Sequence, residues 1–201
     1  MEPGTPAYAD LHQQLQTLVA LTDDDFAAFA AALRPLLLKK KELLLREGEL
    51  CQHVAYVESG CLRYFYNVEG DEHTGQFFFE RAWYTDYDSF LRNVPSTQNI
   101  QALEPCRLWQ LPRNDLYRLY DERPVFERFG RLMAEHAFRG LRARNDALLN
   151  LSPQERYLRL LRERPKVIER VPQHYIASHL GLKPESLSRI RKRLYDNRRL
   201  S

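Results

Sequence analysis

The feature that most constrains the fold is the region from residue 36 to 112, where short apolar segments alternate with turn-forming residues. Ser59-Gly60 and Glu69-Gly70-Asp71 each separate two such segments, a pattern typical of hairpins. Short strands at roughly ten-residue spacing indicate a sandwich or a jelly roll. The expected strands are 36–40, 43–46, 53–58, 61–66, 72–79, 97–103 and 107–111.

Helical segments flank this region on both sides, so the predicted fold class is α+β. Leu11, Leu15 and Leu18 recur at helical spacing, and a second helix is expected to begin at Thr22 and to end at Pro35. A short helix is expected from Arg113 to just before Pro124. A long helix should then run from Pro124 to about Leu149.

The long helix carries two apolar stripes. One can cover the β region and the other a partner helix, which predicts a homodimer. Small residues on the first stripe would allow close approach, whereas the alternative is one broad face buried within a single chain. The dimer stripe is Phe126, Gly130, Met133, Ala137 and Gly140, and the second is Phe129, Leu132, His136 and Leu148.

Charge is distributed unevenly along the 201 residues, although the net charge is only +3. From Ser152 onward there are 13 basic and 5 acidic residues, whereas residues 1–151 hold 17 basic and 22 acidic ones. A basic tail of +8 on a body of −5 suggests that the tail meets a polyanion. A solvated basic surface helix is the alternative.

The stretch from Val171 to Ile190 has the pattern of a helix-turn-helix. A separate helix is expected before it, beginning with a capping box at Ser152-Pro153-Gln154-Glu155. Ile176, Ala177 and Leu180 line one face of a first helix, and Gly181 permits the turn. Pro184 then opens a second helix, whose buried side is Leu187, Ile190 and Leu194. A helical hairpin with solvated charges is the alternative.

The exposed side of this second helix carries side chains suited to DNA. Arg189 can donate two hydrogen bonds to guanine, Glu185 can accept from cytosine, and Ser188 can reach a base edge. The predicted phosphate contacts are Lys183, Ser186, Lys192 and Arg193.

The tail resembles the helix-turn-helix of the Crp/Fnr superfamily of bacterial transcription regulators, through its Glu-x-x-Ser-Arg pattern at Glu185 to Arg189. The segments 44–49 and 56–63 resemble the first strands of the family's cyclic-nucleotide-binding-like jelly roll. The resemblance implies a cyclic-nucleotide-binding-like sensor domain (1–123), a dimerisation helix (124–151) and a winged-helix-like DNA-binding domain (152–201). It further implies a homodimer on a pseudo-palindromic site, with RNA polymerase as a partner and Glu185, Ser188 and Arg189 in the major groove.

Family members that bind cyclic AMP hold its phosphate with a Gly-Glu pair and an Arg about ten residues later. Here the stretch 83–90 has no such pair, Ser96 falls near the Arg position, and Asp86 and Asp88 would repel a phosphate. We therefore expect no control by cyclic AMP. The candidate effector pocket is aromatic, although the same residues can simply fill a core: Phe77, Phe79, Trp83, Tyr84, Tyr87 and Phe90.

The sequence predicts neither a cofactor nor a metal site nor an enzyme. Lone histidines such as His53, His73 and His136 are more often structural than haem ligands, and no catalytic motif is present. The odd number of cysteines and the lack of an apolar span or a basic N-terminal segment predict a cytoplasmic protein without membrane contact. A wing could come only from the connection 164–171. The alternative function is a small-molecule sensor that acts mainly through protein contacts.

Overall fold

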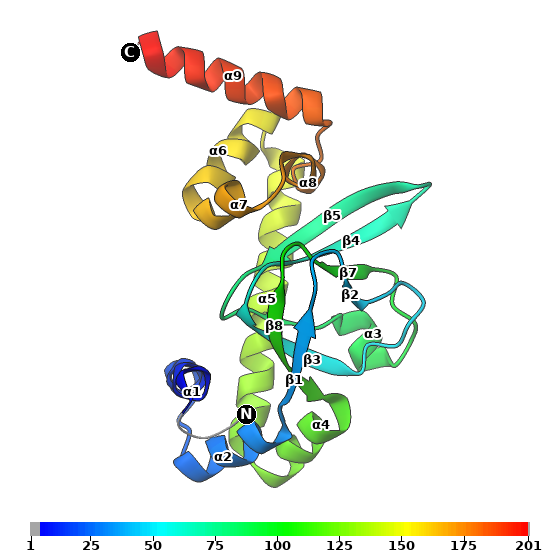
Figure 1. The fold of residues 1–201 in the computed structure, drawn as a ribbon, viewed down its shortest axis with the longest axis vertical. Helices are drawn as coiled ribbons and strands as arrows, with labels where there is room; N and C mark the ends of the chain where they lie inside the picture. Colours follow the sequence, from blue (N-terminus) through cyan, green and yellow to red (C-terminus); the bar gives the residue numbers. More distant parts are fainter. Residues whose placement is uncertain (1–4, 201) are drawn as a thin grey trace. The chain divides into compact units, whose positions relative to one another are not determined.

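The computed structural model describes residues 5–200, with side chains described up to residue 196. Two helices come first, α1 (Pro6–Leu18) and α2 (Asp23–Ala32) (Figure 1). The predicted start of α2 is confirmed, because Thr22 Oγ1 accepts from Asp25 N at 3.1 Å and Thr22 N donates to the Asp25 carboxylate at 3.2 Å. The predicted end at Pro35 is wrong. Pro35 lies in an edge strand, where its missing N–H is tolerated.

Two four-stranded sheets follow, with strand orders β1-β8-β3-β6 and β2-β7-β4-β5. The predicted combination of helices with antiparallel sheets is confirmed, and each expected strand overlaps an observed one. The strands are β1 (Arg34–Leu38), β2 (Leu43–Leu45), β3 (His53–Ser59), β4 (Leu62–Val68), β5 (Asp71–Phe78), β6 (Trp83–Tyr84), β7 (Asn99–Ala102) and β8 (Cys106–Pro112). The sequence did not predict the two-residue β6 or the following helix α3 (Tyr87–Arg92), since neither is long enough to show a periodicity.

The core of the first part of the chain is rich in stacked aromatic rings. Phe29 of α2 stacks on Phe126 of α5 (Pro124–Asn150), with ring centroids 5.3 Å apart. Trp83 lies edge-on to Phe29 at 6.0 Å and to Phe129 at 5.4 Å. The first turns of the long helix are therefore fixed against α2 and the β6 strand. All three cysteines are buried free thiols.

The remaining chain is helical, as predicted, and continues from α4 (Arg113–Glu122) and α5 into α6 (Pro153–Glu163), α7 (Pro165–Arg170), α8 (Gln173–His179) and α9 (Pro184–Leu200). A capping box at Ser152 and Glu155 begins α6, as expected. The connection 164–171, the one segment expected to be able to supply a wing, contains the helix α7 and no strand. Among residues 113–200 the structure contains no strand. No helix in the described part of the chain is long and apolar enough to cross a membrane.

The chain divides into two compact units. Unit 1 comprises the residues up to Tyr64 together with Phe77–Phe138, and unit 2 comprises Phe65–Gln76 together with the residues from Arg139 on. The division cuts α5 between Phe138 and Arg139. It also assigns the tip of the β4–β5 hairpin to the unit that contains α6 to α9, an arrangement that no sequence pattern indicated.

Candidate nucleic-acid interface and effector site

The helices α8 and α9 are joined by a tight turn at Gly181. The Leu182 amide donates to the Ala177 carbonyl at 2.9 Å, and the Gly181 amide donates to the Ser178 carbonyl at 3.0 Å. These two bonds make a Schellman motif, which requires a left-handed residue after the helix, and Gly181 has a φ of +68°. Leu180 and Leu187 on either side of the turn are buried. The turn therefore fixes how α9 leaves α8.

The outer face of α9 carries charged side chains that form no ion pair with the described residues. Glu185, Ser188, Arg189 and Lys192 are all exposed, and one helical face holds them together. Among the described residues, Glu185 and Lys192 form no ion pair, and Arg189 contacts only Ser186 Oγ, at 3.5 Å. Many arginines elsewhere in the described part of the chain pair with a carboxylate, as Arg123 does with Asp24 and Asp25 on unit 1.

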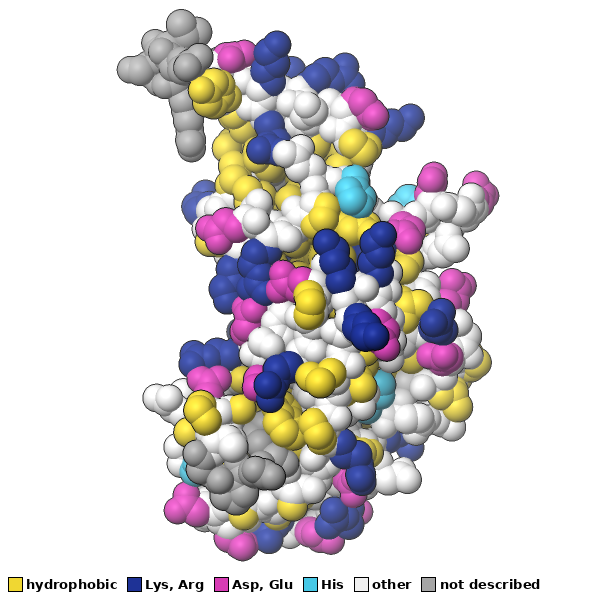
Figure 2. All heavy atoms as spheres, viewed as in Figure 1, with side chains coloured by type: hydrophobic (Ala, Val, Ile, Leu, Met, Phe, Trp, Pro, Cys, Tyr) yellow, Lys and Arg dark blue, Asp and Glu magenta, His cyan; other side chains and the backbone are white. Residues whose placement is uncertain are grey.

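The predicted phosphate-contact residues differ in their exposure. Lys183, Lys192 and Arg193 are exposed, whereas Ser186 is half-buried and lies within reach of Arg189. Figure 2 shows several Lys and Arg side chains on the surface around α9. The structure thus brings together on one helix every predicted DNA residue except Lys183, which directly precedes it.

The tip of the β4–β5 hairpin holds α8 through backbone hydrogen bonds, all within unit 2. Ser178 Oγ donates to the Glu72 carbonyl at 2.7 Å and accepts from the Thr74 amide at 2.9 Å. His179 Nδ1 lies 2.9 Å from the Gly75 carbonyl, so the neutral ring carries its proton on Nδ1. Burial, aided by Arg144 and Arg164, lowers the pKa of His179 to about 3. Sequence reasoning missed this contact, because residues about 100 positions apart form it.

At the position of the expected phosphate cassette, a buried carboxylate is hydrogen-bonded to a buried hydroxyl group. Asp86 precedes α3 and is buried, and the buried Ser96 hydroxyl donates to its carboxylate at 2.6 Å. Ser96 Oγ also accepts from the Gln98 amide at 3.1 Å. Among the described residues no Lys or Arg contacts Asp86. A phosphate placed here would meet a carboxylate instead of a guanidinium.

Most of the predicted effector-pocket residues belong to the core. Phe77, Phe79 and Tyr84 are buried, and Trp83 packs on Phe29 and Phe129. Only two of the predicted residues, Tyr87 and Phe90, line a cavity of about 340 Å³ in unit 1. The other residues around that cavity come from β3, β8, α3 and the segment before it, α4 and α5, and the sequence gave no reason to place these elements together.

The predicted dimer stripe on α5 is largely used within the chain. Phe126 is buried in the core, Met133 packs against that core, and a Cβ on Gly130 would lie 2.1 Å from Tyr120 Oη. These residues therefore do not form the free face that the sequence predicted. Ala137 and Gly140 are half-buried, and Gly140 has open space around it. The exposed apolar residues of α5 are instead Phe138 (64%), Leu141 (59%) and Leu149 (74%).

Comparison with known proteins assigns the β region to a family. Residues 35–123 match the cyclic nucleotide-binding domain. A search of curated proteins gives no sequence match. The fold matches solved structures closely despite low identity, so these likenesses concern the fold alone.

Three of these structures are similar over most of both chains. FixK2 from Bradyrhizobium japonicum has a TM-score of 0.73 at 17% identity, over 82% of this chain and 85% of its own. The c-di-GMP-responsive global regulator CLP of Xanthomonas campestris gives 0.70 at 17%, over 88% and 93%. A putative Crp/Fnr-family transcriptional regulator from Eubacterium rectale gives 0.70 at 18%, over 98% and 89%. The chain therefore shares the fold of these three proteins.

Proposed function

We propose that the protein is a sequence-specific DNA-binding transcription regulator. The observation that carries the proposal is the outer face of α9, where Glu185, Arg189 and Lys192 are exposed and form no ion pair among the described residues. Unpaired cations favour a polyanion, and an Arg–Glu–Ser set on one helix face is suited to base edges in the major groove. The helices α8 and α9 act as the helix-turn-helix, and 152–201 is the DNA-binding domain.

The test begins with selection of the preferred duplex from a random pool, followed by fluorescence anisotropy at several salt concentrations. Arg189→Ala should lower the preference for the selected duplex about 5- to 150-fold, because a bidentate Arg–guanine contact is worth about 1–3 kcal/mol. Lys192→Ala should weaken all duplexes alike and reduce the salt slope by about 1.

The matched control is Arg128→Ala, which removes the same charge from an exposed position on α5. It should leave both the preference and the salt slope unchanged. Equal affinity for all duplexes, or a preference that survives Arg189→Ala, would contradict the proposed readout.

The regulator acts as a homodimer, and the exposed face of α5 supports this part of the proposal. Phe138, Leu141 and Leu149 lie on one side of the helix and are each more than half exposed. Two recognition helices about 34 Å apart would then enter successive major grooves of a pseudo-palindromic site. RNA polymerase is the further partner proposed for the DNA-bound dimer.

Sedimentation velocity tests the dimer. Phe138→Glu with Leu141→Glu should yield monomers at concentrations where the wild type is dimeric, since two charges would be buried without partners. His136→Glu, exposed on the opposite side of α5, is the control and should stay dimeric. An unchanged sedimentation coefficient in the double variant would place the interface elsewhere.

The proposed regulator does not respond to cyclic AMP. The support is the Ser96–Asp86 hydrogen bond at 2.6 Å, which puts a carboxylate where the phosphate would lie. Calorimetric titration with cyclic AMP should give no saturable heat, and a micromolar Kd would contradict this part of the proposal.

A further inference from the structure

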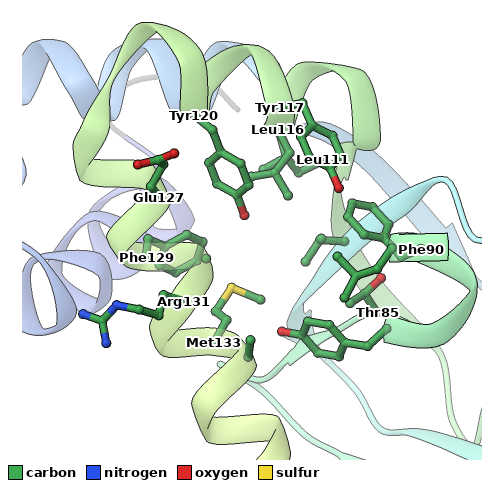
Figure 3. A pocket seen from close by; sticks show the side chains of 15 residues that line it. Thr85, Phe90, Leu111, Leu116, Tyr117, Tyr120, Glu127, Phe129, Arg131 and Met133 are labelled. Atoms are coloured by element: carbon green, nitrogen blue, oxygen red, sulfur yellow. The ribbon is translucent and has the colours of Figure 1, made fainter.

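The cavity of unit 1 has the size of a small-molecule site. Its volume is about 340 Å³, near the lower end of the range of roughly 300–1,000 Å³ for ligand pockets. It lies between α3, α4 and α5, with β3 and β8 behind (Figure 3). The residues that matter most to its chemistry are Tyr87, Phe90, Tyr117, Tyr120, Phe129 and Met133.

The lining favours an uncharged aromatic compound. Phe90 and Phe129 are buried in the core and present ring faces, and Met133 adds a polarisable thioether. Two lining residues are charged, Glu127 and Arg131, and both are exposed on α5. Arg131 is paired with Glu135. A charge carried into the apolar part of the cavity would lose its hydration, because both charged lining residues are exposed.

Two hydroxyl groups supply polarity to this apolar site. Neither Tyr87 nor Tyr120 has a hydrogen-bond partner within the described residues. Burial raises the pKa of each to about 12, so both stay protonated at neutral pH and can donate. Figure 3 shows the Tyr120 hydroxyl directed into the space between the helices.

Gly130 keeps the Tyr120 hydroxyl in this position. A Cβ at Gly130 would lie 2.1 Å from the hydroxyl oxygen and 2.7 Å from Tyr120 Cζ. Any larger residue would drive the ring toward the cavity and fill it. The absence of a side chain at residue 130 therefore preserves both the volume and the donor.

We propose that this cavity binds a small, uncharged aromatic compound bearing a hydrogen-bond acceptor, with its rings against Phe90 and Phe129 and the acceptor at Tyr87 and Tyr120. Neither Asp86 nor Ser96 lines the cavity, so the proposed ligand does not contact the Asp86–Ser96 pair described above, although Tyr87 and Phe90 belong to the same stretch, 83–90. Binding here does not depend on DNA binding by α9.

The test uses the full chain and the neutral fluorescent probe N-phenyl-1-naphthylamine, displaced in turn by 1-indanone and by indane, which lacks the carbonyl. The wild type should bind the probe saturably and should bind 1-indanone about five- to tenfold more tightly than indane, as one hydrogen bond predicts. Tyr87→Phe with Tyr120→Phe should abolish that difference while leaving the indane affinity unchanged.

Two further variants locate the probe. Ala134→Trp, at an exposed position on the cavity lining, should abolish probe binding without altering the fold. Tyr8→Phe in α1, away from the cavity, is the control and should change nothing. Absence of saturable binding, probe binding that survives Ala134→Trp, or equal affinity for the two displacers in the wild type would each overturn the proposal.

Discussion

Gly130 and Gly140 lie on the same helix, and replacing each with alanine should have opposite effects on stability. Both substitutions gain about 0.5–1 kcal/mol from helix propensity. A Cβ at Gly140 meets nothing within 4 Å, whereas one at Gly130 would lie 2.1 Å from Tyr120 Oη. That contact forces the tyrosine ring to move, and overpacking of this kind costs about 1–3 kcal/mol.

Because the propensity gain is common to both variants, the difference between them isolates the overpacking. Gly140→Ala should raise the free energy of unfolding. The free energy of unfolding of Gly130→Ala should lie about 1–3 kcal/mol below that of Gly140→Ala. Urea unfolding measures both. Fluorescence of Trp83 and Trp109 follows unit 1, and circular dichroism follows the helices of both units.

Gly130→Ala combined with Tyr120→Leu supplies the control, since the shorter side chain removes the clashing atoms. The double variant should recover most of the loss caused by Gly130→Ala, measured against Tyr120→Leu alone. Equal stabilisation by the two glycine substitutions, within about 0.5 kcal/mol, would refute the close approach of Tyr120.

Three more predictions follow from hydrogen bonds in the structure. Ser178→Ala should cost about 1–3 kcal/mol in urea unfolding, because two backbone groups of the β4–β5 hairpin lose their partner, whereas Ser188→Ala on exposed α9 should change stability by less than about 0.5 kcal/mol. The pKa of His179 is about 3 in the folded chain, whereas an unperturbed histidine has a pKa of 6.5. Stability should therefore fall as the pH drops below about 6.5, by up to about 1.4 kcal/mol per pH unit, and His179→Gln should flatten that dependence in titrations at pH 5 and 7. Ser96→Ala should cost about 1.5–3 kcal/mol by thermal unfolding, because it leaves the buried Asp86 carboxylate without its hydroxyl donor, and added cyclic AMP should not restore the loss.

The elements with local signals could be predicted from the sequence. Capping boxes at Thr22 and Ser152 begin helices where expected, and the Ser59-Gly60 turn separates two observed strands. The exposed side of α9 was also predictable, because the apolar residues Leu187 and Ile190 define the buried side of a 3.6-residue period.

What packs against each face of a helix could not be predicted from the sequence in the same way. The apolar spacing along α5 shows that it has two stripes, but a periodicity does not say which stripe faces its own chain. The structure buries Phe126 of the predicted dimer stripe within its own chain and exposes Phe138 and Leu141, which belong to neither predicted stripe. The contact of Tyr120 with Gly130 depends on the angle between two helices, which no local pattern encodes.

The hairpin tip has a consequence for anyone who would exchange parts of this protein. The polypeptide passes between the two units after Tyr64, after Gln76 and after Phe138, so no single cut separates them. A fragment or chimera that begins in α5 would carry α8 without the carbonyls and the amide that Ser178 and His179 bind. Recombination at one joint would therefore leave an incomplete module unless residues 65–76 were transferred with it.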